Sequence, residues 1–190
     1  MRKFEALMHI KELGLNVGEL KEFEYSQKAE MFEYARYLFK KFGHLIIRTD
    51  FPKHVTGKVP LNLPFISPCK DFRQFEEFVE THKEKFTYLL FQGCDYSKAI
   101  LSAYVYLDEL GRMHAEINDV DKINMRDAMK VTGHLKTLVI GPGAGYDDRL
   151  NKVRFQLIKA QIPPNKVVEL SVFDVNGIPT PVYKQFREGF

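Results

Sequence analysis

Apolar residues at helical spacing over residues 31–42 form a stripe that constrains the fold of the first half of this chain more than any other pattern. Gly43 follows the stripe, and the apolar run 45–47 comes after one further residue, His44. A stripe of this kind is typical of a helix that buries one face, and the short branched apolar run is typical of a buried strand. The pattern therefore predicts a helix that ends at Gly43 and a strand over 44–49. The residues of the stripe recur at intervals of three and four: Met31, Tyr34, Ala35, Leu38, Phe39 and Phe42.

Helix-start signals place two helices in this half. Ser26 is a good N-cap for the striped helix. Asp71 with Gln74 three residues later resembles a capping box at the start of another. The pattern also predicts a helix over residues 2–13 and strands over residues 16–25, 59–66 and 86–92. These elements predict a first α/β lobe over residues 1–90.

The second half has the pattern of antiparallel hairpins. The first hairpin has a turn that ends in Gly111, between apolar segments at 100–107 and 112–117. The second has a turn that ends in Gly177, between apolar segments at 166–173 and 180–186. A strand over 135–140 and a helix over 147–161 lie between the hairpins. The predicted fold class is α+β, as a single compact unit with a second, antiparallel lobe over residues 91–190.

Composition excludes several classes of protein. The 190 residues are 45% hydrophobic and 28% charged, which argues against disorder, and a net charge of +3 is small for a nucleic-acid binder. Cys69 and Cys94 are too few for a disulfide scaffold or a four-cysteine zinc site. No apolar run reaches the roughly 18 residues of a membrane span, and the N-terminus lacks the apolar core of a signal peptide. We therefore expect a cytoplasmic protein.

RNA binding is an alternative, since the chain has 9 tyrosines, 16 phenylalanines and a pI near 8.7. Phe72, Phe75 and Phe78 fall on one helical stripe, however, which is the pattern of core packing. We therefore do not expect nucleic acid as a partner.

Arg48 and the loop that follows it are the strongest candidates for phosphate binding. Arg48 is predicted near the end of a strand, where a guanidinium offers a fixed fork of donors. The loop adds Lys53, Gly57 and Lys58, so phosphate binding and a solvated basic loop are both consistent with these residues. The glycine-rich stretch 141–145 lacks the Lys-Ser/Thr of a phosphate loop, and its pattern favours a turn followed by aspartate capping.

The last hairpin holds a candidate metal ligand. Alternation places Glu169 and Ser171 on one face of a strand, and it places Tyr183, Gln185 and Arg187 on one face of the returning strand. A carboxylate there could hold Mg²⁺ together with substrate phosphates, and an ordinary exposed sheet face explains the same pattern.

The order of these features resembles the ATP-grasp superfamily, whose members clamp ATP between two sheets. The resemblance rests on Leu45-Ile46-Ile47-Arg48-Thr49-Asp50, the loop 53–58, Leu89-Leu90-Phe91-Gln92-Gly93, the hairpin 104–112 and the hairpin 169–187. The strand with Arg48 also resembles the nucleotide domain of phosphoenolpyruvate synthase, though more weakly. In the ATP-grasp pattern, Arg48, Lys53 and Lys58 bind phosphate, Leu90 and Gln92 form the adenine hinge, and Glu169 and Gln185 stand at the metal.

The resemblance implies ATP and Mg²⁺ as cofactors, and an ATP-dependent ligase or phosphotransferase that acts on a carboxylate. Gln185-Phe186-Arg187 stands where the family has Glu-x-Asn, which implies a weak metal site. The motif itself occurs at Glu116-Ile117-Asn118, but this segment does not have the motif's place in the family's order of elements along the chain. The alternative is a catalytically degenerate module for binding or assembly. The chain also lacks the additional N-terminal domain usual in the family, which points to a partner chain or a homo-oligomer. The pattern assigns no catalytic residue.

Overall fold

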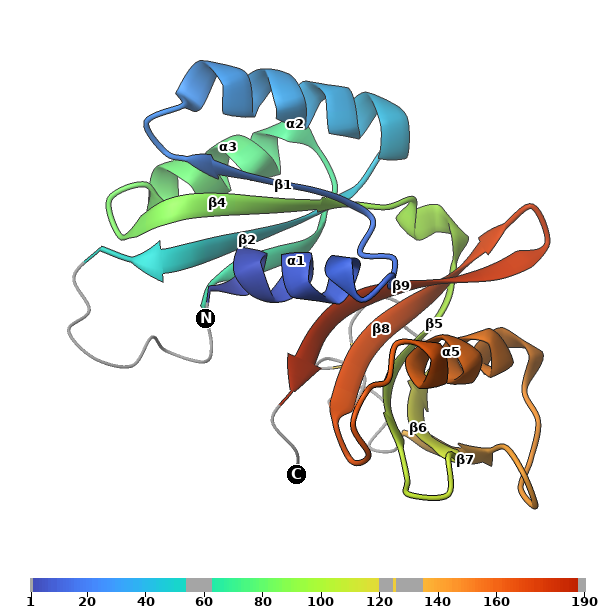
Figure 1. Cartoon of the computed structure of the whole chain (residues 1–190). Helices are drawn as coiled ribbons and strands as arrows, with labels where there is room; N and C mark the ends of the chain where they lie inside the picture. The colour runs from blue at the N-terminus through green and yellow to red at the C-terminus, as the bar shows by residue number, and fades with distance from the viewer. Residues whose placement is uncertain (1, 54–62, 120–124, 126–134, 188–190) are drawn as a thin grey trace. The chain divides into compact units, whose positions relative to one another are not determined.

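The computed structural model describes residues 2–53, 63–119, 125 and 135–187. The chain divides into two compact units. Unit 1 comprises residues 1–5 and 18–96, and unit 2 comprises residues 6–17 and 97–190. Each unit is built on one antiparallel sheet with helices packed against it (Figure 1). This confirms the predicted α+β class.

Unit 1 holds a four-stranded sheet in the order β1-β4-β2-β3, and all of its strand pairs are antiparallel. Two helices cover one face of this sheet (Figure 1). Helix α1 (Lys3–Glu12) begins in unit 1 and continues into unit 2. The elements of unit 1 are β1 (Glu19–Glu24), α2 (Lys28–Phe42), β2 (Leu45–Pro52), β3 (Phe65–Cys69), α3 (Phe72–His82) and β4 (Phe86–Gly93).

The starts of α2 and α3 differ in how well the sequence predicted them. Asp71 is the N-cap of α3, and its carboxylate accepts a hydrogen bond from the backbone N–H of Gln74 at 2.9 Å, as expected. The predicted cap at Ser26 is wrong. Ser26 donates to Glu24 at 3.1 Å instead, and the N-cap of α2 is Gln27, whose side chain makes no capping bond.

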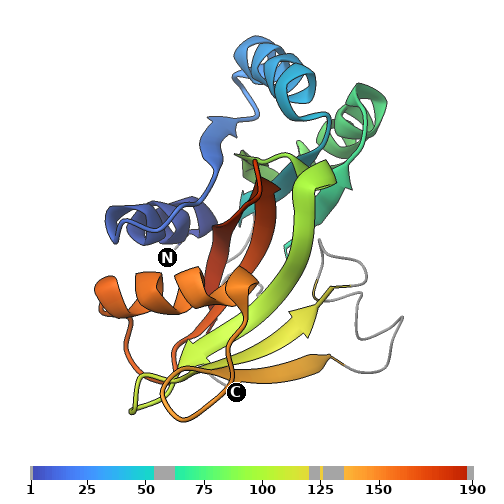
Figure 2. The same ribbon diagram turned by 90° about the vertical axis from the view of Figure 1, so that its right-hand side faces the viewer.

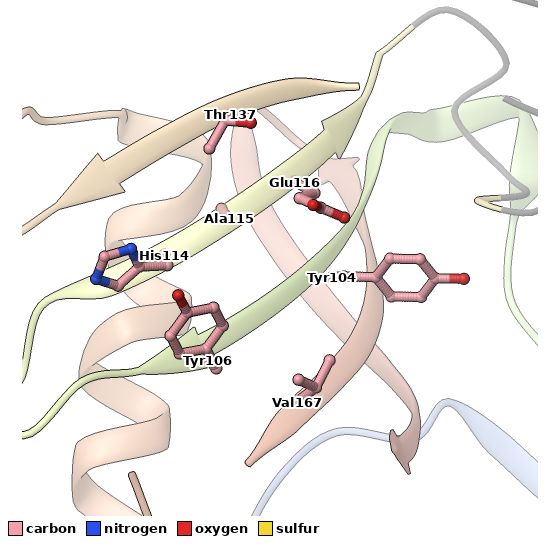
Figure 3. Close-up of a pocket in the computed structure, with 7 residues that line it drawn as sticks. All are labelled: Tyr104, Tyr106, His114, Ala115, Glu116, Thr137 and Val167. Carbon is pink, nitrogen blue, oxygen red and sulfur yellow. The ribbon is translucent and has the colours of Figure 1, made fainter. Parts of the chain in front are cut away.

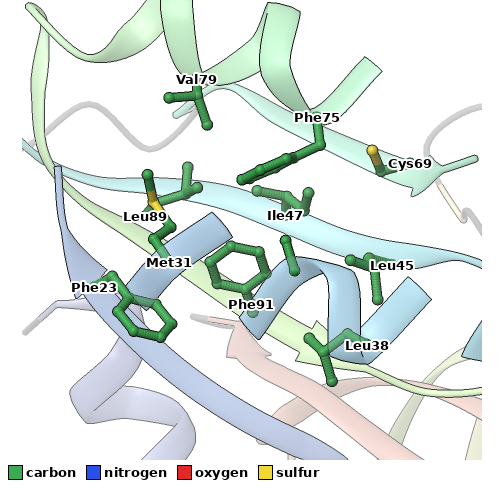
Figure 4. Packing of buried hydrophobic residues seen from close by; sticks show 11 residues of the cluster. Phe23, Met31, Leu38, Leu45, Ile47, Cys69, Phe75, Val79, Leu89 and Phe91 are labelled. Atoms are coloured by element: carbon green, nitrogen blue, oxygen red, sulfur yellow. The ribbon is translucent and has the colours of Figure 1, made fainter. Parts of the chain in front are cut away.

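The core of unit 1 lies between the two helices and the sheet (Figure 4). Phe91 of β4 is fully buried there, and its ring centroid is 5.7 Å from those of Phe23 and Tyr34 and 5.8 Å from that of Phe75. Such ring contacts add to the free energy gained from burial. The striped face of α2 is buried as predicted, through Met31, Ala35 and Leu38.

Strand β2 is longer than the sequence indicated. The prediction ended this strand at Thr49, but the strand runs to Pro52, so Arg48 lies in its middle. The loop expected at 53–58 is described only at Lys53, because residues 54–62 lie outside the described part of the chain. The strand expected over 59–66 begins only at Phe65 and runs to Cys69, since Leu63 and Pro64 are described and are not in a strand.

Unit 2 holds a five-stranded sheet in the order β7-β6-β5-β8-β9. Helix α5 (Asp148–Lys159) covers one face and packs against β5 and β9 (Figure 2). Both predicted hairpins are confirmed. The strands are β5 (Ala99–Leu107), β6 (Met113–Asn118), β7 (Lys136–Ile140), β8 (Val167–Val175) and β9 (Ile178–Arg187).

The glycine-rich stretch 141–145 forms the turn between β7 and α5 that its pattern predicted. The backbone N–H of Ala144 donates to the carbonyl of Gly141 at 3.0 Å. Asp147 then caps α5, because its carboxylate accepts from the backbone N–H of Arg149 at 2.9 Å. None of the described helices is long and apolar enough to cross a membrane.

A β-bulge in β9 overturns one prediction about the last hairpin. Gln185 pairs with Glu169, but Tyr183 pairs with the next residue, Leu170, so Lys184 is an extra residue in β9. Because neighbouring residues of a strand point to opposite faces, Tyr183 and Gln185 do not share a face. The Tyr183 hydroxyl instead donates to Gln156 of α5 at 2.8 Å.

The core of unit 1 yields a stability prediction. Phe91→Ala leaves a cavity among three aromatic rings and should lower the free energy of unfolding by about 3–5 kcal/mol in chemical denaturation. Phe155→Ala is the matched control, because Phe155 is 58% exposed on α5. Its effect should stay within about 0.5 kcal/mol. Equal losses in the two variants would contradict the packing described here.

Candidate functional site

The face of the unit 1 sheet opposite α2 and α3 brings together residues predicted to bind nucleotide. Leu90 of β4 pairs with Arg48 of β2 on one side and with Glu22 of β1 on the other, and Arg48 also pairs with Phe65 of β3. Residues directly opposite in antiparallel strands lie on the same face. Glu22, Leu90, Arg48 and Phe65 therefore form one row across the face opposite α2 and α3.

Gln92 lies on the same face, two residues along β4 from Leu90. It pairs with Ile46 of β2 and with Leu20 of β1, and it is fully buried. The structure thus places Arg48, Leu90 and Gln92 on one surface. The guanidinium, an apolar side chain and an amide lie in adjacent rows, and Leu90, like Gln92, is fully buried. These are side-chain types that contact phosphates and heteroaromatic rings in proteins.

Tyr96, just after β4, is a member of this neighbourhood that the sequence analysis did not single out. It opens the short helix η1 (Tyr96–Lys98) and is buried. Burial raises the pKa of its phenol well above the ordinary value, and the nearby charge of Arg48 acts in the opposite direction. No sequence motif marks this tyrosine, since its proximity to Arg48 depends on how β4 and β2 pair.

The two lysines predicted beside Arg48 do not join it in the described structure. Lys53 is exposed, and its ammonium group donates to the backbone carbonyl of Lys83 at 2.8 Å, in the turn between α3 and β4. Lys58 lies outside the described residues. Arg48 is therefore the one predicted phosphate ligand, among those described, that shares a face with Leu90 and Gln92.

The unit 2 sheet also has a polar face, opposite α5. Its central row runs through paired residues on all five strands: Thr137, Glu116, Tyr104, Glu169 and Gln185. Glu169 is 9% exposed, and the side-chain amide of Gln185 donates to one of its oxygens at 2.7 Å. The two residues predicted at the metal site are thus in direct contact.

The next row on this face is buried and hydrogen-bonded. Ser102 and Ser171 share a hydroxyl–hydroxyl bond of 2.5 Å, and Asn118 pairs with Ser102 on the neighbouring strand. A signal for this face was present in the sequence, because polar residues occupy every second position of 102–106 and 114–118. In the sequence, Glu116-Ile117-Asn118 stands out only as a rival metal motif.

The residues at Glu169 supply little for a metal ion on their own. Glu169 offers one carboxylate, and Gln185 offers an amide oxygen. Within the described ranges, no group of three or more His, Cys, Asp or Glu side chains is arranged to hold a metal. Mg²⁺ is commonly held by one or two carboxylates together with substrate phosphates. These residues therefore fit Mg²⁺ only as part of a nucleotide complex.

Glu22, at the β1 end of the row that holds Arg48, is an unusual carboxylate. Burial raises its pKa to about 7, although Arg2 lies 3.2 Å away and acts to lower it. The negative charges of Asp50 and Glu5 add to the upward shift. Arg2 in turn packs over the ring of Tyr88 at 4.3 Å, so the first residues of the chain lie against this end of the sheet.

Glu22 yields a prediction about pH. Its pKa is about 7 in the folded chain, against 4.5 for an ordinary glutamate, so the folded state holds an extra proton between these values. The free energy of unfolding therefore falls as the pH rises through this window. Glu22→Gln removes this loss. We expect the variant to gain on the order of 1–3 kcal/mol relative to wild type between pH 5 and pH 8 in denaturant titrations.

The control for this prediction is Glu76→Gln, which alters an exposed carboxylate on α3. Its stability difference from wild type should not change with pH. A difference for Glu22→Gln that is equally flat from pH 5 to pH 8 would disprove the raised pKa.

Comparison with known proteins finds likeness in structure alone. No family model and no curated protein matches the sequence. The D-alanyl-alanine synthetase A of Vibrio cholerae superposes with a TM-score of 0.52 at 8% identity, over 97% of this chain and 54% of its own. An ATP-grasp ligase of Chryseobacterium gregarium, associated with ribosomally made peptides, gives 0.52 at 11% identity, over 96% and 50%.

The macrocyclase MdnC of Microcystis aeruginosa is a further match, with a TM-score of 0.51 at 9% identity over 97% of this chain and 52% of its own. The chain thus spans about half the length of the solved structures it matches. At such identities the likeness establishes the fold, and it confirms the resemblance drawn from the order of the sequence motifs. The chain has the fold of the ATP-grasp superfamily.

Proposed function

We propose that the chain binds ATP at Arg48, Leu90 and Gln92 and acts as an ATP-dependent ligase or phosphotransferase on a carboxylate substrate. The observation that carries this proposal is the common face of these three residues in a chain with an ATP-grasp fold. The ligases among its structural neighbours support the reaction type, and one of them was solved with ADP and a leader and core peptide. A peptide is therefore the substrate class that this neighbour favours.

Each residue has a distinct task in this proposal. The guanidinium of Arg48 neutralises phosphate charge through charge-assisted hydrogen bonds. Leu90 packs against the adenine ring, and the amide of Gln92 offers both a donor and an acceptor to it. Glu169 of unit 2 remains a prediction from the sequence as a ligand of Mg²⁺. Lys53 and Lys58 remain predictions from the sequence.

The chemistry of such an enzyme is in-line transfer of the terminal phosphoryl group of ATP to a carboxylate oxygen. The protein contributes mainly position and charge, because this transfer needs little covalent participation from side chains. Arg48 in the middle of β2 suits that task, since a strand paired on both sides holds its side chain on a rigid base.

A second candidate function is a module that binds nucleotide, or assembles with a partner, without catalysis. The hydrogen bond from Gln185 to Glu169 favours it, because the amide satisfies the carboxylate that would otherwise face a metal. A glutamine also brings no negative charge to the site.

The first test is stabilisation by nucleotide. ATP at 100 times its dissociation constant should raise the free energy of unfolding of the wild-type chain by about 2.7 kcal/mol. Arg48→Gln should weaken binding about 10- to 100-fold, because it removes a charge-assisted hydrogen bond. Arg73→Gln is the control, since this arginine is 87% exposed on α3. The proposal fails if millimolar ATP stabilises neither the wild type nor the control.

The second test separates the enzyme from the module. Gln185→Glu places a second carboxylate opposite Glu169 and should raise Mg²⁺ affinity at least tenfold if a residual metal site exists there. Mg²⁺ titrations followed by thermal unfolding, with and without ATP, measure this gain. Gln161→Glu adds the same charge at an exposed position of unit 2 and should show no gain. Unchanged Mg²⁺ affinity in Gln185→Glu would favour the module.

A further inference from the structure

Exposed apolar side chains lie on and beside α5 in unit 2. Leu110, in the turn between β5 and β6, is 72% exposed, and Phe155 and Ile158 of α5 are 58% and 42% exposed. The polar side chains Tyr104 and Glu116 belong to the other face of the same sheet (Figure 3). The apolar surface is therefore separate from that polar face.

Arg154 of α5 connects these apolar side chains. Its Nε atom donates to the backbone carbonyl of Gly111 at 2.7 Å, next to Leu110 in the chain. Its guanidinium carbon is 5.5 Å from the centroid of the Phe155 ring. Ile158 follows Arg154 by four residues, so the two side chains are neighbours on the helix. We call Leu110, Arg154, Phe155 and Ile158 the Arg154 patch.

Two glycine-containing turns hold the guanidinium of Arg154 in place. One supplies the carbonyl of Gly111. The other is the glycine-rich turn 141–145, where Gly141 has a φ of +135° and a Cβ added to it would lie 2.8 Å from the Nε atom of Arg154. A side chain at Gly141 would therefore displace the guanidinium. The glycine-rich turn thus positions an arginine, a role that its sequence pattern did not indicate.

The terminal nitrogens of Arg154 are open to a ligand. Gly111 occupies Nε, while Nη1 and Nη2 make no hydrogen bond to the residues that the structure describes. Such a fork fits the two oxygens of a carboxylate through parallel hydrogen bonds. Apolar side chains around it exclude water, which strengthens a charged contact of this kind. The patch therefore combines a carboxylate receptor with an apolar surface.

The charge around the patch is positive. Lys152 and Lys159 of α5 are exposed, and neither forms an ion pair within the described ranges. The acidic residues at the start of α5 already have partners. Asp147 binds an arginine of the first turn at 2.7 Å, and Asp148 is hydrogen-bonded to the hydroxyl of Tyr146. An acidic partner complements this surface, whereas a second copy of the chain would bring like charges together.

We propose that the Arg154 patch docks an acidic amphipathic helix of a partner protein. A carboxylate of that helix binds the terminal nitrogens of Arg154, and its apolar side chains pack on Leu110, Phe155 and Ile158. Side chains of a helix and a turn form the patch, so the partner is recognised through side chains and not by addition of a strand. Arginine and aromatic side chains carry much of the binding energy in protein interfaces. This inference does not rest on the proposed nucleotide site.

The test is an NMR titration of the full isotope-labelled chain with a synthetic peptide, in the absence of nucleotide. The peptide has about 18 residues, because isolated helices shorter than about 12–15 residues are marginal in water. It carries leucine along one helical face, glutamate beside that face and alanine elsewhere. We expect the amides of Gly111, Arg154, Phe155 and Ile158 to shift together and to saturate at one dissociation constant. The same peptide with glutamine in place of every glutamate should bind about tenfold more weakly, or worse.

Two variants locate the interaction. Arg154→Gln should weaken peptide binding about tenfold or more, because it removes the charge that pairs with the carboxylate. Phe155→Ala should weaken binding as well, and we expect it to keep nearly wild-type stability because its side chain is exposed. Arg73→Gln is the control, since it removes an exposed positive charge from α3 of unit 1 and should bind as the wild type does. Unchanged amide spectra of β5 and β9 in each free variant confirm that the fold is intact.

Three results would overturn the inference: no saturable shift at these amides, equal affinity for the two peptides, or equal affinity in the wild type and both variants. Two further outcomes would replace the occupant. Shifts of the same amides with oligothymidylate would indicate a nucleic-acid site, and shifts with rising concentration of the chain alone would indicate a second copy. Because no nucleotide is present, failure here leaves the proposed function standing, and a chain that does not bind ATP could still dock the peptide.

Discussion

Strand β4 is the element on which the rest of unit 1 depends, because it pairs with both β1 and β2 and its side chains serve both faces of the sheet. Phe91 lies in the aromatic core under α2 and α3. Since strand residues alternate, its burial fixes Leu90 and Gln92 on the opposite face, next to Arg48. A shift of β4 by one residue would exchange the two sets. The hydrophobic core and the candidate nucleotide site are therefore consequences of the same strand register.

In unit 2, too, the alternation of strand residues decides which side chains face the helix and which lie on the opposite face of the sheet. Its apolar positions lie under α5, so the alternate positions form a continuous polar face that contains Glu169, Tyr104 and Glu116. The bulge at Lys184 matters here, because it lets Tyr183 bond to α5 while Gln185 stays opposite Glu169. An irregularity of one residue thus preserves both the core contact and the polar pair.

The sequence predicted those features that depend on local periodicity and local hydrogen bonds: the stripe of α2, the Asp71 cap of α3, the turn before Asp147 and both hairpins of unit 2. It also placed Arg48, Leu90 and Gln92 in the correct strands. It did not reveal the row through Tyr104, because that row depends on pairing between strands far apart in the chain. The bulge at Lys184 lies within a local hairpin, and no residue type in the sequence marks it. The Ser26 cap is wrong because the N-cap of α2 is Gln27, one residue later.

The central claim is that ATP binds at the face of the unit 1 sheet opposite α2 and α3, and site-resolved NMR tests it most directly. In a titration of the isotope-labelled chain with a non-hydrolysable ATP analogue, the backbone amides of Arg48, Leu90 and Gln92 should shift together and saturate at one dissociation constant. Amides on the exposed side of α3, such as that of Arg73, should not move. Saturable shifts elsewhere with none at these three residues, or no shifts at millimolar analogue, would contradict the account.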